Sequence, residues 1–515
     1  GDIVIGAEEA TRITAVASAT SIAAAAGLRG VGISGAGASS LNVILTSVQA
    51  LVTDAGLDAV SGDVNVTARN VTSINASIQS ISAALAGGLG AGFGTSVGSA
   101  NARNFVGYDP FEEFETYDYD SGSDNPSIIR NGDTVYLNEN SGTRAGEYYT
   151  YIGTFPIFKF DFNDDGVEDN LLLTQDYTDV AKWRQEVAEQ PILVTAMVTD
   201  STVDAGGDVR ITADNEQNVQ SKVESGSFAL ATGAVSFALS TGGSNTVNLI
   251  NADVTAEIGK TTAGTGSDVS AGGNLTVTAD ESSTIKATAE AASLAGALGI
   301  GVAGAAGIAG AVSRIEGGTA ARITGSVLDI EGDATVRAAQ SATIDSRAEA
   351  AAGAAGLAAV AGGGVYADGT LAATLDAVIT DSTLAVTGQL SLIADSRSTI
   401  DSEVGASAVA IGLIGAAEAG STAKVTVTPT VRALISGGNV SAGEIVIRAS
   451  ADQTARSQST AFSVATTAAV GASIATSTLT STVKAGLGDN VTLSAGALSI
   501  DADNRDYLDI ASEAI

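Results

Sequence analysis

The segment GNLTVTA at residues 273–279 decides the fold, because it is one copy of a heptad that recurs along the whole chain. It has the form Gly-x-apolar-x-apolar-x-Ala, and apolar residues that alternate after a glycine turn predict a half-buried β-strand. The other copies are GDIVIGA (1–7), GDVNVTA (62–68), GDVRITA (207–213), GDATVRA (332–338), GQLSLIA (388–394), GEIVIRA (443–449) and GALSIDA (496–502). From residue 207 onward, consecutive copies start 66, 59, 56, 55 and 53 residues apart. The spacing predicts a protein built from repeats of about that length.

A second position keeps the same phase in every copy. The residues twelve positions after the glycines are Ile13, Ile74, Val219, Ile285, Ile344, Ile400, Ala455 and Leu508. Around Ile285 the alternation continues, with Ala287 on the same face and Lys286 and Glu290 on the other. A shift of one residue would turn the whole apolar set outward. The pattern therefore predicts parallel, in-register stacking of the repeats.

Each repeat continues into a tract rich in Gly and Ala, of which the longest is the uncharged segment 291–312. Its length suits a membrane-spanning helix. Equivalent tracts recur in most copies, however, and each of the glycines, such as Gly299 and Gly304, would cost a helix about 1 kcal/mol relative to Ala. Small side chains instead allow two layers of strands to approach closer than the usual ~10 Å. We therefore expect tightly packed strands here and no membrane span.

These patterns predict an all-β fold, a parallel β-solenoid (β-helix) built from repeats of about 53–66 residues. Two arrangements remain open, one broad coil per repeat or two narrow coils per repeat. A series of small β-sandwiches is a further alternative, since alternating strands also build those.

The composition excludes several classes of function. The chain has 24 Lys and Arg against 58 Asp and Glu, a net charge of −34, which argues against a nucleic-acid partner. It has no Cys and no His, so disulfides, zinc–thiolate sites and catalytic triads that need imidazole are absent. Oxygen ligands for hard cations remain available.

The chain divides at an interruption of the repeat. Residues 1–106 and 191–515 carry repeats, whereas residues 107–190 hold eight of the ten Tyr and have 19 acidic against five basic residues. This composition predicts a small β-rich module inserted into the repeats. Because the chain begins with Gly1 and ends inside a repeat at Ile515, we expect capping units, an export signal and an anchor to lie outside it.

The module contains a candidate calcium loop, DFNDDGVED at residues 161–169. Its spacing matches the start of a D-x-[DN]-x-[DN]-G loop, in which oxygens surround a hard cation and a glycine permits the sharp turn. The candidate ligands are Asp161, Asn163, Asp165, the carbonyl of Val167, and Asp169. Position 12 is Leu172, so the bidentate Glu of an EF-hand is missing. The loop resembles the calcium loops of FG-GAP-type repeats and dockerin-like segments, and the alternative is an acidic surface turn.

A set of aromatic residues in the module resembles small carbohydrate-binding modules of the chitin-binding type, in which ring faces stack on sugars. The candidate glycan contacts are Tyr149, Tyr151, Tyr177 and Trp183. The alternative is that these rings form the core of the module itself.

Taken with the heptads, the segments ITDSTL (379–384) and TQDYTD (174–179) resemble giant repetitive bacterial surface exoproteins of the filamentous-haemagglutinin-like kind. The resemblance implies secretion, a cell-surface or matrix location, and an adhesive or scaffolding role.

The expected function is therefore that of a non-enzymatic extracellular structural or adhesive protein, a rod-like segment of a bacterial surface adhesin or fibre. The module would bind Ca²⁺ or glycan. Expected partners are copies of the same chain, joined end to end or laterally, and surface glycans or matrix. The alternative function is a polysaccharide-active β-helix enzyme that works with carboxylates and arginines.

Overall fold

The computed structural model describes residues 1–114, 116–138, 144–153, 155–159, 170–262 and 264–515. These residues form β-strands and connecting turns, with no helix among them. Seventeen strands belong to one large sheet system: β1 (Ile3–Ile44), β2 (Ser47–Thr53), β3 (Gly56–Ala59), β4 (Val64–Val106), β13 (Ile192–Thr199), β14 (Thr202–Ala205), β15 (Val209–Gly259), β16 (Asp268–Ala271), β17 (Leu275–Thr324), β18 (Val327–Ile330), β19 (Ala334–Ala355), β20 (Ala358–Ile411), β21 (Ile414–Val427), β22 (Thr430–Ala465), β23 (Ala468–Leu479), β24 (Thr482–Leu487) and β25 (Thr492–Ala514). Nowhere in the part of the chain that the structure describes is there a helix with the length and apolar character needed to cross a membrane.

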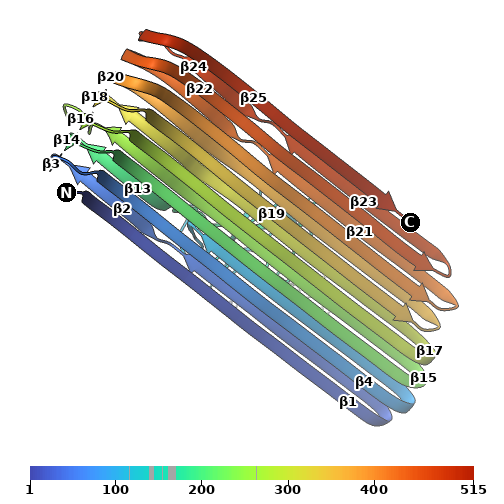
Figure 1. The fold of residues 1–515 in the computed structure, drawn as a ribbon. Helices are drawn as coiled ribbons and strands as arrows, with labels where there is room; N and C mark the ends of the chain where they lie inside the picture. Colours follow the sequence, from blue (N-terminus) through green and yellow to red (C-terminus); the bar gives the residue numbers. More distant parts are fainter. Residues whose placement is uncertain (115, 139–143, 154, 160–169, 263) are drawn as a thin grey trace.

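The long strands pair in parallel, with each repeat beside the next (Figure 1). Val64 of the second heptad pairs with Ile3 of the first, and Val209 of the third pairs with Val64. Each repeat therefore pairs with the next along its length, and one repeat forms one step of the parallel stack. Such continuous parallel pairing also rules out a series of separate antiparallel sandwiches.

The register of the stack confirms the column predicted from the sequence. Ile285 pairs with Ile344, and Ile344 pairs with Ile400. All three side chains are fully buried. The outward Lys286 and Glu290 are exposed, as the alternation predicts. Equivalent side chains from successive repeats thus lie against one another and form a continuous apolar core.

Each repeat forms two layers of strand. In β15 an outgoing half runs from the heptad to a turn near Thr232, and a return half runs back from Val235. The layers approach closely, because a Cβ atom on Gly242 of the return layer would lie 2.7 Å from the carbonyl oxygen of Ala292 in the outgoing layer. The segment 291–312 lies within β17, so it forms strands, as predicted.

A ladder of side chains explains the Gly-Asp start of the heptad. The backbone N–H of Asp208 donates to Oδ1 of Asp63 (2.9 Å), and the N–H of Asn274 donates to Oδ1 of Asp208 (2.7 Å). The hydrogen bond from the Asp208 backbone, followed by that from Arg210, lowers the pKa of Asp63. Each carboxylate or amide therefore satisfies a backbone donor of the next repeat at the turn, where no strand partner exists.

A serine ladder stabilises the next turn of each repeat in the same way. The N–H of Ser201 donates to Oγ of Ser267 (3.3 Å), and the N–H of Ser267 donates to Oγ of Ser326 (3.2 Å). Asp200 and Asp381 precede such serines with φ values of 48° and 49°, in the left-handed region that Asp tolerates better than most residues. These roles account for the T-D-S-T pattern at the end of the repeats.

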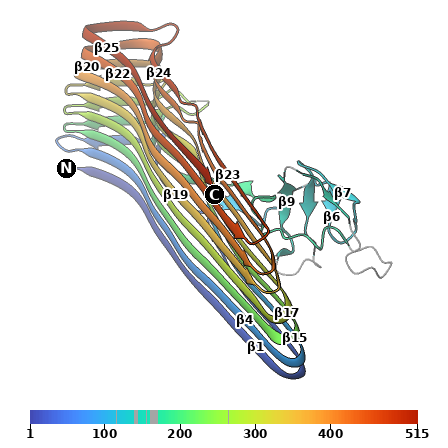
Figure 2. The ribbon, with the colours of Figure 1, turned by 90° about the vertical axis from the view of Figure 1, so that its right-hand side faces the viewer.

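The inserted segment leaves the large sheet after Val106 and rejoins it at Ile192. It projects from the side of the stacked strands (Figure 2). Its strands are β5 (Tyr108–Asp109), β6 (Tyr119–Asp120), β7 (Ile128–Ile129), β8 (Thr134–Tyr136), β9 (Tyr148–Tyr151), β10 (Ile157–Phe158), β11 (Trp183–Glu186) and β12 (Ala188–Glu189). Pairing of β5 with β12 brings the two ends of the insertion together at the sheet.

Candidate functional site

The four aromatic residues predicted as glycan contacts lie in the core of the inserted segment. Tyr149, Tyr151 and Trp183 are 2–3% exposed, and Tyr177 is 8% exposed. The ring centroids of Tyr177 and Trp183 are 4.5 Å apart. The rings pack against one another, as they would in a core of the segment's own, while Tyr149, Tyr177 and Trp183 also line part of the cleft described below.

The predicted calcium loop, with Asp161, Asn163, Asp165, Val167 and Asp169, lies outside the described residues. Within the described ranges, no group of three or more acidic side chains is placed to hold a metal ion.

A cleft lies where the inserted segment meets the return layer of the sheet. It has a volume of about 350 Å³. The inserted segment contributes Arg144, Tyr149, Gln185 and Glu186 to its walls, among other residues. The sheet contributes Arg103, Leu249, Arg314, Tyr366 and Asp368, which come from four different repeats.

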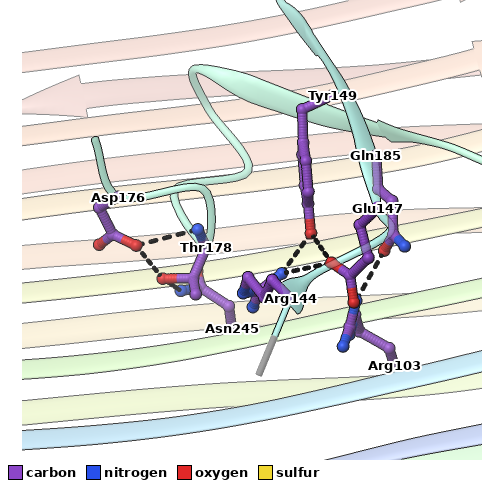
Figure 3. A network of polar contacts seen from close by, with 8 residues as sticks. All are labelled: Arg103, Arg144, Glu147, Tyr149, Asp176, Thr178, Gln185 and Asn245. Carbon is purple, nitrogen blue, oxygen red and sulfur yellow. Dashed lines mark hydrogen bonds and ion pairs between the residues drawn. The ribbon is translucent and has the colours of Figure 1, made fainter. Parts of the chain in front are cut away.

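A buried carboxylate organises one wall of this cleft (Figure 3). Glu147 accepts a hydrogen bond from Nη1 of Arg103 at 2.6 Å and forms an ion pair with Arg144 at 3.4 Å. Arg103 also donates to Oε1 of Gln185 at 3.1 Å. Because Arg103 lies on β4 and the other three residues lie in the insertion, this network fixes the segment to the sheet.

Tyrosine hydroxyls act as hydrogen-bond donors around the cleft. Tyr149 donates to Oε2 of Glu147 at 2.5 Å and accepts a hydrogen bond from Arg144. Tyr366 donates to Oδ2 of Asp368 at 3.0 Å. Burial raises the pKa of both phenols well above the ordinary value, so they stay protonated over the physiological range.

A second contact ties the cleft's rim to the sheet. Asp176 accepts hydrogen bonds from the backbone N–H and the hydroxyl of Thr178, at 2.9 and 2.5 Å. Asn245 of β15 then donates to the Thr178 hydroxyl at 3.4 Å (Figure 3). The predicted TQDYTD signature therefore contains a rim turn as well as the core residue Tyr177.

Among the residues that the structure describes, two buried donors in the cleft have no hydrogen-bond partner. They are Nε2 of Gln185 and Nε of Arg314, the latter 3.7 Å from a carboxylate oxygen of Glu316. A buried polar group without a partner costs stability, so such groups mark places where another molecule can supply an acceptor. The cleft has carboxylates as well as arginines, since Glu186 and Asp368 also line it.

Sequence reasoning missed these cleft residues. Arg103 and Arg314 are the first charged residues after the uncharged segments 70–102 and 291–313, and this position is the one signal of their role in the sequence. Glu147 and Gln185 carry no such signal, because they meet Arg103 through the packing of the insertion against the sheet.

Comparisons with known proteins identify no relative: no protein family, curated protein or solved structure matches the chain.

Proposed function

We propose that the chain is a segment of a β-solenoid rod with a structural and adhesive role at a bacterial cell surface or in the extracellular matrix. The in-register column through Ile285, Ile344 and Ile400 carries this proposal. Stability in such a stack is shared between neighbouring repeats, which suits an extended scaffold. The resemblance to filamentous-haemagglutinin-like exoproteins supports the extracellular location, and the net charge of −34 favours solubility.

Electron microscopy of the full chain tests the rod. The outgoing layer from Val64 to Leu89 is about 85 Å long, and stacked repeats are spaced by about 4.8 Å. We expect flat particles that are about 85 Å long in the direction of the strands. Diffraction from aligned material should show a spacing of about 4.8 Å perpendicular to the strands. Compact globular particles would contradict the proposal.

We further propose that the cleft is the adhesive site and that it binds a short saccharide. Sugar hydroxyls both donate and accept hydrogen bonds, and the cleft has donors in Gln185 and Arg314 and acceptors in Glu186 and Asp368. The volume of about 350 Å³ lies in the range of small-molecule sites. Three of the four residues predicted as glycan contacts, Tyr149, Tyr177 and Trp183, line this cleft.

A glycan array probed with the full chain, followed by calorimetry with any saccharide retained, tests the cleft. Arg314→Met should weaken binding by about tenfold or more, because it removes a cleft donor to the sugar. Arg347→Met is the matched control, since Arg347 lies on β19, does not line the cleft and should bind normally. Equal binding by both variants would refute the site.

The polysaccharide-active enzyme remains the second candidate, because the cleft combines carboxylates with arginines. Incubation of the chain with retained glycans and measurement of new reducing ends distinguishes the two. We expect binding without turnover, and catalytic release of reducing ends would favour the enzyme.

A further inference from the structure

The end of the stack opposite the heptads carries no charge over most of its area. In the middle repeats, the uncharged segments that form this end are 70–102, 225–252, 291–313, 350–367 and 404–417. Glu224, Glu290 and Glu349 pair in register in the outgoing layer and mark the border. We call the part of the stack between this row and the far turns the apolar end; it lies at the lower right in Figure 1.

Large apolar side chains point outward from this end. Among them are Leu89, Phe93, Phe237, Leu298, Val360 and Leu413, each between 39% and 83% exposed. Phe93 and Phe237 pair in register in neighbouring repeats, with ring centroids 6.4 Å apart. With Val31 and Val302, which pair with them in register and are also exposed, they form a ridge along the return layer, unlike the singly scattered apolar residues that are normal on a protein surface.

Rows of small residues lie on the outgoing layer of this end. A groove of about 500 Å³ follows the outgoing layer, and its walls include Ala291, Ala292, Ala350 and Ala351, the exposed Phe462 and the three border glutamates. A ridge of one molecule fits into a groove of this kind on another, as side chains interdigitate between packed sheets.

The size of the apolar end matches what a stable interface needs. Seven stacked repeats span about 30 Å, and eight residues between the border and the turn span about 26 Å, so one layer offers roughly 800 Å². A stable protein–protein interface buries about 800 Å² on each partner.

We propose that the apolar end binds the apolar end of a second copy of this chain. Because the net charge is −34, two copies repel wherever their charged surfaces meet, and this end carries few charges, mainly the border glutamates and Glu418 on the return layer. If a twofold axis relates the two copies and their apolar ends overlap face to face, the Glu224–Glu290–Glu349 row of one copy lies beside the far turns of the other copy. The two rows are then about 26 Å apart, beyond the screening length of about 8 Å at physiological salt.

A lipid bilayer is a poorer occupant for this surface. The border row places three glutamates where lipid headgroups would lie, whereas Lys and Arg are the residues that anionic membranes attract. The interface does not depend on the saccharide proposal, because the residues of the cleft and of the groove are different.

Sedimentation velocity of the full chain over low to high micromolar concentrations, without saccharide, tests the interface. We expect a concentration-dependent dimer. Leu294→Lys, at a half-exposed site on the outgoing layer, should weaken dimerisation by at least about tenfold, because it buries a charge in the interface. Val327→Lys is the matched control, because Val327 is similarly exposed but belongs to β18 at the opposite end, and it should dimerise like the native chain.

Far-ultraviolet circular dichroism establishes that each variant is folded, and Leu298→Lys at the far turn is a second substitution should the first disturb the strand. A native chain that stays monomeric overturns the proposal, and so does a dimer that the folded Leu294 and Leu298 variants leave unchanged. A monomer that floats with phosphatidylcholine vesicles overturns it in favour of lipid.

Discussion

Glu281 is a buried carboxyl group in the stack, and its ionisation should make the stability of the protein depend on pH. It is 3% exposed and accepts hydrogen bonds from Ser283 (3.0 Å), Thr319 (3.0 Å) and Gln340 (3.2 Å). Burial raises its pKa from the ordinary 4.5 to about 7, because the loss of water disfavours the charged form more than the three hydrogen bonds favour it.

The direction of the effect follows from this shift. An acid that is harder to ionise in the folded state stabilises the fold fully below pH 4.5, and this stabilisation is lost as the pH rises to about 7. A difference of about 2.5 pKa units corresponds to about 3 kcal/mol in the free energy of unfolding. Above pH 7 the contribution of Glu281 is constant.

Glu281→Gln should remove the loss of stability that the ionisation of Glu281 causes between pH 4.5 and 7. Glu281 pairs in register with Asn215 and Gln340, so a glutamine continues a column of amides and keeps the side chain's size. Urea unfolding followed by circular dichroism from pH 4.5 to 8 measures the effect. We expect the native chain to lose about 3 kcal/mol more than the variant over this range.

Glu349→Gln is the control, because it removes the same charge from an exposed position on the outgoing layer. Its pH profile should run parallel to that of the native chain. Parallel profiles for the native chain and Glu281→Gln would show that the buried carboxyl group does not titrate in this range, and would refute the reasoning.

Three further predictions concern the core, the layers and the inserted loop. Ile344→Ala should lower the free energy of unfolding by about 2–5 kcal/mol, since the Ile344 side chain is fully buried. Asp345→Ala, on the opposite face of the strand, should change it by less than about 1 kcal/mol. Urea unfolding measures both changes. Gly242→Ala should lower the melting temperature, because the new Cβ meets a backbone oxygen at 2.7 Å, whereas Gly364→Ala, with no atom within 4 Å, should leave it equal or higher. Calorimetry should detect Ca²⁺ binding to the native chain and its loss in Asp161→Ala, and a native chain that binds no Ca²⁺ would refute the loop's assignment.

The sequence contains enough information to predict the stack, because the signals that specify it are local. A glycine turn, alternating apolar residues and a constant offset of twelve residues are visible in each copy, and the pairing of Ile285 with Ile344 confirms the register they predict. The sequence did not distinguish one broad coil per repeat from two narrow coils, since the choice depends on how far the chain runs before it turns back. The structure shows a single long excursion for each repeat, with one turn near Thr232 in β15.

The cleft could not be predicted for a different reason. Arg103, Glu147 and Gln185 meet although up to 82 residues separate them, and Arg314 joins the same wall from a later repeat. Their proximity depends on how the insertion packs against the sheet, which no periodic pattern encodes. The aromatic residues were visible in the sequence, but composition alone does not distinguish a ring that faces solvent from one that packs against its neighbours.

The two ends of the insertion meet where it joins the stacked sheet. Strands β5 and β12 pair directly, and the N–H of Gln190 donates to the carbonyl of Gly107 at 3.1 Å, so the insertion enters and leaves the repeat at adjacent points. The strands of the host repeat therefore keep their pairing whichever segment lies between those two points. A different segment inserted between these two points would leave the pairing of the repeats unchanged, so this junction lets the insertion vary while the stacked sheet keeps its geometry.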